Sequence, residues 1–351
     1  MTNAFTASGL FAFYLSDAGI AAEFGAAAFT GRMLAFEAAW TRGLEAAGLV
    51  TPEDAAEALS AIAAYSGSAP GSGSERDGLP VPALVAALRQ GLSEGGARAI
   101  HTGATSQDVI DTAMVLTLLA VAARTAQRLQ QVHAQVEGLR ARFGDRALVA
   151  RTRMQAALPA TASLRLSAWA RPLGDHLTRL GHLRDDLARV QIGGAIGTRD
   201  APEGRGATVA AEAAAALGLG LGPVWQADRS AMVGFGHWLA LVAGTLGKIG
   251  QDVLLMAQQG VDEIELSGGG GSSAMPHKHN PVGAEAMVAI ARFVGAQQGL
   301  LAQAMLHEQE RSGTAWALEW LTLPAMAEAC GASLRHAERL IASVERIGAP
   351  D

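Results

Sequence analysis

The 351-residue sequence has little cysteine, few aromatic residues and few charges. Cys330 is the only cysteine, so no intrachain disulfide can form, which fits a reducing cytoplasm. Aromatic residues make up 5% and charged residues 17% of the chain, whereas hydrophobic residues make up 50%. The net charge of −6 argues against a broad nucleic-acid-binding surface. We therefore expect a cytoplasmic protein with a large core and no nucleic-acid partner.

The sequence also lacks the features of a targeting or membrane segment. Its N-terminal part has no basic region of the kind that begins a signal peptide, and it carries Asp17 and Glu23 early. No uninterrupted apolar run looks long enough to cross a bilayer, so we expect no membrane partner. Cys330 lies within a helical pattern, where we expect a buried thiol and not a nucleophile.

Alanine, leucine and glycine dominate what is present, and a composition this rich in alanine and leucine favours helices over sheets. Residues 104–137 contain no glycine or proline, and their apolar positions recur at helical spacing, which predicts a helix about 50 Å long. Four further long helical patterns follow, over residues 159–189, 201–217, 230–260 and 281–307. The pattern over 230–260 is apolar on nearly all sides, which predicts a bundle core or a subunit interface.

We accordingly predict an all-α fold built as an elongated bundle of long helices. Residues 66–78 are rich in Ser, Gly and Pro and should form a loop within the N-terminal part of the chain. We assign residues 1–100 to an N-terminal helical domain and residues 101–351 to the central bundle.

The most specific motif is residues 268–281, Gly-Gly-Gly-Gly-Ser-Ser-Ala-Met-Pro-His-Lys-His-Asn-Pro. Glycines with exposed amides, two hydroxyls, an ammonium and an amide side chain together suit a lid that closes over an anionic substrate. A phosphate loop is disfavoured because no Ser or Thr follows Lys278 and no strand precedes the glycines. A metal site at His277 and His279 is disfavoured because no cysteine or carboxylate cluster accompanies them. We expect no metal and no cofactor.

This segment resembles the signature of the fumarase/aspartase superfamily, and the similarity extends over essentially the whole chain. In that family the first serine of the pair is the catalytic base, and the Lys and Asn bind a substrate carboxylate. The resemblance implies that Ser272 and Lys278 are catalytic and that Asn280 binds substrate, with Ser273 as the alternative base. A serine can act as a base only where nearby positive charge stabilises its alkoxide.

Residues 101–112, His-Thr-Gly-Ala-Thr-Ser-Gln-Asp-Val-Ile-Asp-Thr, have the local features of a helix start. Helix capping alone could explain Thr105 or Ser106. The whole string resembles the family's His-x-Gly-Ala-Thr-Ser-x-Asp region. It implies that Thr105, Ser106 and Gln107 bind substrate and that His101 is catalytic, although a structural role for His101 is the alternative.

Residues 151–155, Arg-Thr-Arg-Met-Gln, resemble an Arg-Thr-His-x-Gln segment of several lyases in the superfamily. The histidine of that segment helps in acid/base catalysis, but Arg153 stands at its position here. An arginine cannot be a general acid near neutral pH, although it can clamp a carboxylate. The resemblance implies that Thr152, Arg153 and Gln155 bind substrate, and the missing histidine disfavours an adenylosuccinate or argininosuccinate lyase.

Three weaker matches agree with this family. Residues 191–198 resemble its glycine-rich turn, and residues 225–229 match a cycloisomerase segment only at Trp225 and Arg229. Residues 307–320 resemble another cycloisomerase stretch and suggest Arg311 as a further carboxylate ligand, with Arg229 as a second candidate. Trp316 and Trp320 lie four positions apart, so helix packing explains them equally well.

Within the superfamily the sequence is most similar to the bacterial 3-carboxy-cis,cis-muconate cycloisomerases. The resemblance implies a cofactor-free cycloisomerase of aromatic (protocatechuate) degradation that acts on a small polyanion, and a homotetramer in which three subunits build each active site. It leaves open whether every acid group is a carboxylate or another anion such as a sulfonate, and whether addition is syn or anti. A fumarate-releasing lyase and a non-catalytic structural relative are the alternatives. Relatives continue as a small C-terminal helical domain, which we expect to be absent here.

Overall fold

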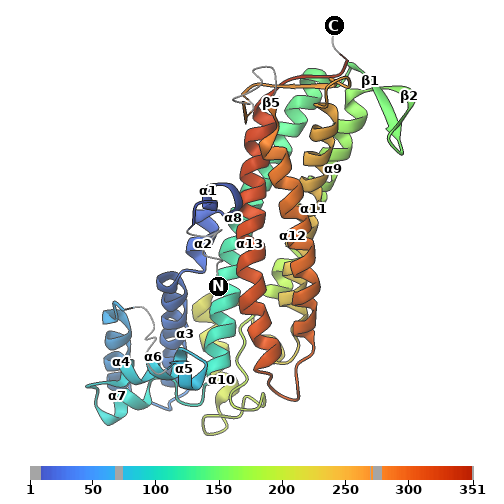
Figure 1. The fold of residues 1–351 in the computed structure, drawn as a ribbon. Coiled ribbons are helices and arrows are strands. Elements are labelled where there is room, and N and C mark those ends of the chain that lie inside the picture. The colour runs from blue at the N-terminus through green and yellow to red at the C-terminus, as the bar shows by residue number, and fades with distance from the viewer. Residues whose placement is uncertain (1–8, 68–73, 269, 272–278, 350–351) are drawn as a thin grey trace.

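The computed structural model describes residues 9–67, 74–268, 270–271 and 279–349. Five long helices dominate these ranges and run side by side as an elongated bundle (Figure 1). They are α8 (Ser106–Phe143), α9 (Ala162–Leu187), α11 (Ser230–Met256), α12 (Val282–Ala302) and α13 (Thr314–Ala342). The short 3₁₀ helix η1 (Gln303–Met305) extends α12. The helix-rich structure confirms the expectation of an all-α bundle.

The shorter helices gather beside one end of the bundle (Figure 1). They are α1 (Ala12–Leu15), α2 (Ala18–Glu23), α3 (Ala26–Ala46), α4 (Pro52–Ala64), α5 (Ser74–Asp77), α6 (Val81–Arg89), α7 (Glu94–Arg98) and α10 (Gly206–Leu217). Gly43 allows α3 to lie directly against α10, because a Cβ there would be 2.6 Å from the carbonyl oxygen of Val209. Helix α5 interrupts the segment 66–78, which we expected to be a loop throughout.

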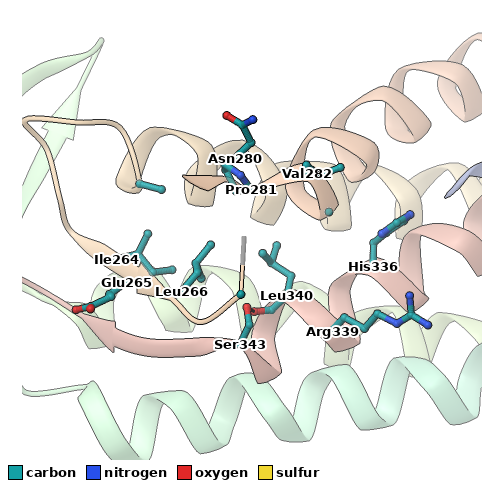
Figure 2. Close-up of a pocket in the computed structure, with 13 residues that line it drawn as sticks. Ile264, Glu265, Leu266, Asn280, Pro281, Val282, His336, Arg339, Leu340 and Ser343 are labelled. Atoms are coloured by element: carbon teal, nitrogen blue, oxygen red, sulfur yellow. Dashed lines mark hydrogen bonds between the residues drawn. The ribbon is translucent and has the colours of Figure 1, made fainter. Parts of the chain in front are cut away.

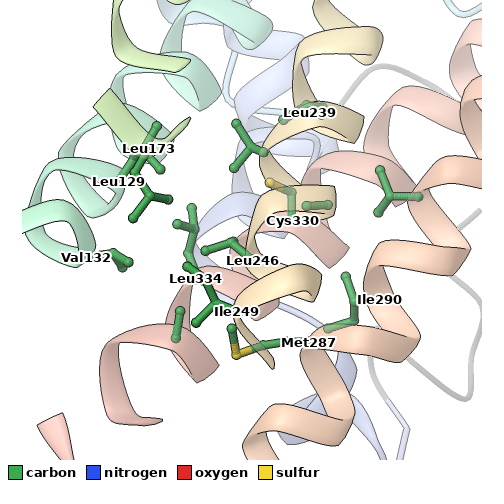
Figure 3. Packing of buried hydrophobic residues seen from close by; sticks show 14 of the residues in the cluster. Leu129, Val132, Leu173, Leu239, Leu246, Ile249, Met287, Ile290, Cys330 and Leu334 are labelled. Carbon is green, nitrogen blue, oxygen red and sulfur yellow. The ribbon is translucent and has the colours of Figure 1, made fainter. Parts of the chain in front are cut away.

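The bundle core is formed by apolar side chains from all five long helices (Figure 3). Helices α11 and α12 approach closely where α11 carries glycine: a Cβ on Gly247 would be 2.4 Å from the Cβ of Ala291. Cys330 is fully buried among these side chains, and burial raises the pKa of its thiol to about 12. A thiol held in its neutral form is a poor nucleophile, which confirms the expectation of an inert buried cysteine.

Helices α8 and α11 are both long and apolar enough to cross a membrane by length and composition. This differs from our expectation that no segment would pass such a test. Of their most apolar windows, 67% in α8 and 50% in α11 is buried inside the chain. Core helices of a bundle have the same character, so the finding is weak evidence for a membrane partner.

Short strands occur at the end of the bundle opposite to α3 and α10. The hairpin of β1 (Ala147–Thr152) and β2 (Gln155–Thr161) projects there from the bundle (Figure 1). Its two-residue turn, Arg153 and Met154, has positive φ angles of 50° and 68°. The helical pattern from residue 159 hid this hairpin, and α9 begins only at Ala162.

Two further strand pairs tie the chain together at the same end. Strand β3 (Ile264–Leu266) pairs with β6 (Val344–Ile347), and β4 (Gly270–Gly271) pairs with β5 (His279–Asn280). All three pairs are antiparallel and contain only two strands each. They terminate helices and shape loops, and they do not alter the helical class of the fold.

Candidate active site

The residues expected to bind substrate fall at two opposite ends of the bundle. Thr105 immediately precedes α8, and β1 begins four residues after α8 ends. A helix of 38 residues is about 57 Å long, so Thr105 and Thr152 of one chain cannot meet. Asn280 lies at the same end as the hairpin (Figure 1). Ser272, Ser273 and Lys278 lie outside the described residues.

We call the end formed by segments 101–107, 191–199 and 306–313 the loop end. The opposite end, which carries the β1–β2 hairpin and residues 279–283, is the hairpin end. The loop end brings several predicted residues together within one chain, while the hairpin end presents its predicted residues on the surface.

At the loop end, the carboxylate of Asp108 joins two segments. It accepts hydrogen bonds from the backbone amides of Gly193 (2.8 Å), Gly194 (3.1 Å) and Thr105 (3.1 Å). The side-chain amide of Gln191 donates a fourth at 3.4 Å. Burial raises the pKa of Asp108 to about 6, although these donors oppose the shift. Asp108 therefore clamps the glycine-rich turn onto the start of α8.

Gln107 and Arg311 were both expected to bind substrate, and the structure places them in contact. The guanidinium Nε of Arg311 donates to the Oε1 of Gln107 at 2.9 Å and its second nitrogen donates to the carbonyl of Ala195 at 3.1 Å. The amide of Gln107 donates in turn to the Asp111 carboxylate and to the Gln226 carbonyl. Arg311 is exposed at the surface of this network, whereas Gln107 is buried beneath it.

Arg229 was expected to be a substrate ligand, and its position argues against that role. Its side chain is 0% exposed, and it pairs with Asp111 at 2.7 Å and with Glu319 at 2.6 Å. Burial alone would lower the pKa of Arg229, but these two carboxylates raise it. Trp316 donates from its indole nitrogen to Asp111 at 2.8 Å. The guanidinium thus has both its faces and its donors occupied, so we assign it to supporting the loop end.

His101 lies in the turn that precedes α8 and is the remaining predicted residue of the loop end. Its Nδ1 is 2.7 Å from the Oε1 of Glu37, a residue of α3 that the sequence patterns did not indicate. Thr105 and Ser106 are half-buried beside it. The structure therefore gathers His101, Thr105, Ser106, Gln107 and Arg311 at one end of one chain.

At the hairpin end, Thr152, Arg153 and Gln155 are all exposed. Arg153 borders a cavity of about 390 Å³ that also contacts Arg165, Lys248 and residues of α11. Arg165 pairs with Glu263 at 2.8 Å and Lys248 pairs with Asp252. Arg153 has no ion pair among the described residues. It is therefore an available cation, which suits a ligand for a carboxylate.

Asn280 borders a second cavity of about 370 Å³ at the hairpin end (Figure 2). The cavity also contacts His336, Arg339 and Ser343 of α13 and its C-terminal cap. The Asn280 amide points away from Leu340 and Ser343 (Figure 2). Among the described residues no group of three or more His, Cys, Asp or Glu side chains is placed to hold a metal ion.

Comparison with known proteins defines the family. A family model described as lyase matches residues 1–295. The chain belongs to the fumarase/aspartase superfamily of lyases. It is 37% identical over 322 residues to the 3-carboxy-cis,cis-muconate cycloisomerase of Pseudomonas aeruginosa, covering 89% of this chain and 70% of that protein. It is 32% identical over 271 residues to the Acinetobacter baylyi enzyme of the same name, covering 76% of this chain and 60% of that protein.

Solved structures of the superfamily share the fold. The 3-carboxy-cis,cis-muconate lactonizing enzyme from Pseudomonas putida superposes with a TM-score of 0.88 at 33% identity. That comparison covers 96% of this chain and 77% of the solved one. A relative of this kind supports transfer of the fold along nearly the whole chain.

Sequence reasoning missed the buried carboxylates that organise the loop end of this superfamily member. Asp108 and Asp111 are the only charged residues in the first four turns of α8, and Glu37 stands alone on an apolar stretch of α3. A lone carboxylate on an apolar helix face is costly unless it is paired. That isolation was the available signal. His307 was also missed, and both its ring nitrogens are buried without a partner among the described residues.

Proposed function

We propose that the protein is a cofactor-free cycloisomerase that converts 3-carboxy-cis,cis-muconate, or a close anionic analogue, into the corresponding muconolactone in aromatic degradation. The observation that carries the proposal is the likeness to curated cycloisomerases along most of the chain. The available cations Arg153 and Arg311 support it, because the substrate is a polyanion. The chain spans 60% to 76% of the length of the first three of these relatives.

The reaction forms one C–O bond and one C–H bond. A carboxylate oxygen of the substrate adds to one carbon of a double bond, and the neighbouring carbon, which lies next to another carboxylate, gains a proton. In the reverse direction a base removes that proton and leaves a carboxylate-stabilised carbanion. In our proposal Ser272 transfers the proton, and Lys278 and Asn280 stabilise the charge that develops on the carboxylate.

We also propose that each active site is shared between subunits of a homotetramer. The length of α8 separates the loop end from the hairpin end within a chain. One subunit would then supply His101, Thr105, Ser106, Gln107 and Arg311, and a second would supply Thr152, Arg153 and Gln155. A third subunit would supply the segment 268–281. Arg229 would hold the loop end together without touching the substrate.

The decisive experiment follows lactonisation by the loss of absorbance of the conjugated diene, with a small panel of substituted muconates that includes a sulfonate analogue. Ser272→Ala should lower turnover by at least about a hundredfold, the range for a lost acid/base group, while the circular dichroism stays unchanged. Ser273→Ala is the matched control and should retain most of the activity. Near-normal turnover in Ser272→Ala would remove Ser272 from this role.

A fumarate-releasing lyase is the second candidate. Arg153 stands where lyases of the adenylosuccinate or argininosuccinate type carry a histidine, which disfavours it. Assays for fumarate release from both of those substrates distinguish the two activities. Failure to turn over every muconate and every succinyl adduct would favour a non-catalytic relative instead.

A further inference from the structure

Helix α3 carries a buried carboxylate directly behind His101. The Glu37 side chain is 0% exposed and its Oε1 lies 2.7 Å from the Nδ1 of His101. The His101 side chain is 15% exposed, so the ring extends from this buried contact toward the surface of the loop end. The imidazole Nε2 makes no hydrogen bond with the described residues. Glu37 therefore holds the inner nitrogen and leaves the outer one available.

The same face of α3 holds the backbone of the turn that carries His101. The Trp40 indole donates to the Thr102 carbonyl at 2.9 Å, and the Thr41 hydroxyl donates to the Ala99 carbonyl at 2.8 Å. Positions 37, 40 and 41 are spaced by three and four residues, so their side chains share one face of the helix. Three neighbouring side chains thus fix the turn from one rigid element.

The turn that they hold is conformationally costly. His101 has a φ of 61° and Gly103 a φ of 84°. A left-handed conformation costs a non-glycine residue about 1–2 kcal/mol, so other contacts must offset it. A histidine that only filled the core would not need this backbone. The conformation directs the imidazole onto Glu37 and places its opposite edge at the loop end.

Glu37 is also poorly suited to stabilising the fold. Its second oxygen, Oε2, is buried without a hydrogen-bond partner among the described residues. A buried polar atom left unpaired costs about 1–3 kcal/mol of stability. Retention of a fully buried carboxylate at this cost favours a role in function.

We propose that Glu37 is a positioning residue that fixes the Nδ1–H form of His101, so that Nε2 is the atom presented to the substrate. An ionised carboxylate can only accept a hydrogen bond, so Nδ1 must carry the hydrogen. The lone pair or proton of Nε2 then faces the site. The chemistry of Nε2 rests on the proposed cycloisomerase function, whereas the ring orientation and tautomer do not.

The test is nitrogen NMR on the full-length protein labelled with ¹⁵N-histidine, with the His101 signals identified by their loss in His101→Gln. The wild-type protein should show a protonated Nδ1 at His101. Glu37→Leu removes the acceptor, so the Nε2–H tautomer should appear. In the lactonisation assay kcat of this variant should fall about 10–100-fold, the range for lost orienting partners of histidine ligands, while KM changes little.

Two further variants separate positioning from folding. Glu37→Gln keeps a side-chain oxygen that can accept from Nδ1, so it should retain the wild-type tautomer and recover part of the lost kcat. Thr41→Val removes a different hydrogen bond from the same face of α3. It should lower stability by about 1 kcal/mol without changing the tautomer.

A protonated Nε2 with an unprotonated Nδ1 in the wild-type protein would overturn the proposal even if no variant folded. An unchanged tautomer in Glu37→Leu would overturn it as well. If the tautomers behave as expected but no muconate is turned over, the proposed function fails while the Glu37–His101 assignment stands.

Discussion

The two ends of the bundle treat their polar side chains in opposite ways. At the loop end Gln107, Asp108, Asp111, Arg229 and Glu319 are all at most 1% exposed, and each is bonded within the chain. At the hairpin end the predicted ligands are exposed, and the turn presents Met154 with 69% of its surface accessible. The loop end is completed by its own chain. The hairpin end offers side chains that need another surface to become a site.

This difference explains why neither end by itself resembles an enclosed active site. A buried charge must be paired, so the loop end spends its acidic residues on structure and leaves only Arg311 and His101 near the surface. The hairpin end keeps Arg153 without an ion pair among the described residues. We expect the two ends to meet only when chains assemble.

The largest expected effect comes from mixing inactive chains. Arg153→Ala and Arg311→Ala should each be inactive, because each removes a cation from every site. If different chains supply these residues, randomly mixed tetramers should recover about a quarter of the wild-type activity, since each site needs the right chain at two positions. Co-expression with two affinity tags and the lactonisation assay measure this.

The matched control mixes Arg153→Ala with Gln155→Ala, whose altered residues share one hairpin. No site in that mixture receives an intact hairpin, so no activity should return. Equal recovery in both mixtures would contradict the shared-site proposal.

The buried ion pairs of Arg229 provide the next largest effect. Arg229→Met leaves Asp111 and Glu319 buried without their cation, which should lower the free energy of unfolding by about 3–5 kcal/mol. Arg153→Met, at the exposed end, should change it by less than about 0.5 kcal/mol. Urea unfolding followed by circular dichroism compares the two. Similar losses in both variants would show that the two ends do not differ in this way.

The third prediction concerns pH and Asp108. Folding raises the pKa of this carboxyl from 3.8 to about 6, so the folded chain binds its proton more tightly than the unfolded chain does. Its contribution to stability is therefore complete below pH 4 and is lost as the pH rises through about 6, by up to about 3 kcal/mol. Asp108→Asn should abolish this pH dependence.

The measurement is the difference in unfolding free energy between the wild type and Asp108→Asn from pH 4 to pH 7, which isolates Asp108 from other carboxyls. A constant difference across that range would refute the assignment. Because asparagine cannot accept from all four donors, the variant should also raise KM for the muconate at pH 7.

The smallest expected effect separates two glycines near α8. Gly103 has a φ of 84°, and a Cβ there would lie 2.6 Å from the Cδ of Pro202. Gly103→Ala should cost about 2 kcal/mol through backbone strain and this clash. Gly138→Ala, within α8 and with nothing within 4 Å of its added Cβ, should instead stabilise by up to about 1 kcal/mol. Thermal unfolding of both variants measures the contrast, and a destabilised Gly138→Ala would contradict it.

Much of the fold was predictable because helix periodicity is local. The pattern over residues 104–137 predicted α8, and the pattern over 230–260 predicted α11 with nearly the same start. The hairpin was missed because its second strand runs into a helical pattern at Pro159. Helix α10 begins at Gly206 and not at residue 201, since a turn at residues 201–204 comes first.

For the candidate site, the motifs indicated which segments carry chemistry but not which side chains are enclosed. Gln107 and Arg311 were predicted separately, and their contact spans 204 positions. Arg229 was expected to bind substrate, although the carboxylates that enclose it lie 118 and 90 positions away.

The sequence by itself determined the helical class, the long bundle helices, the buried thiol and the superfamily, since each depends on composition, short-range periodicity or a contiguous motif. Only the tertiary structure decided that Arg229 is enclosed, that Asp108 clamps two segments and that Glu37 orients His101. Those outcomes depend on which distant carboxylate meets which cation or amide, and burial then makes every such pairing obligatory.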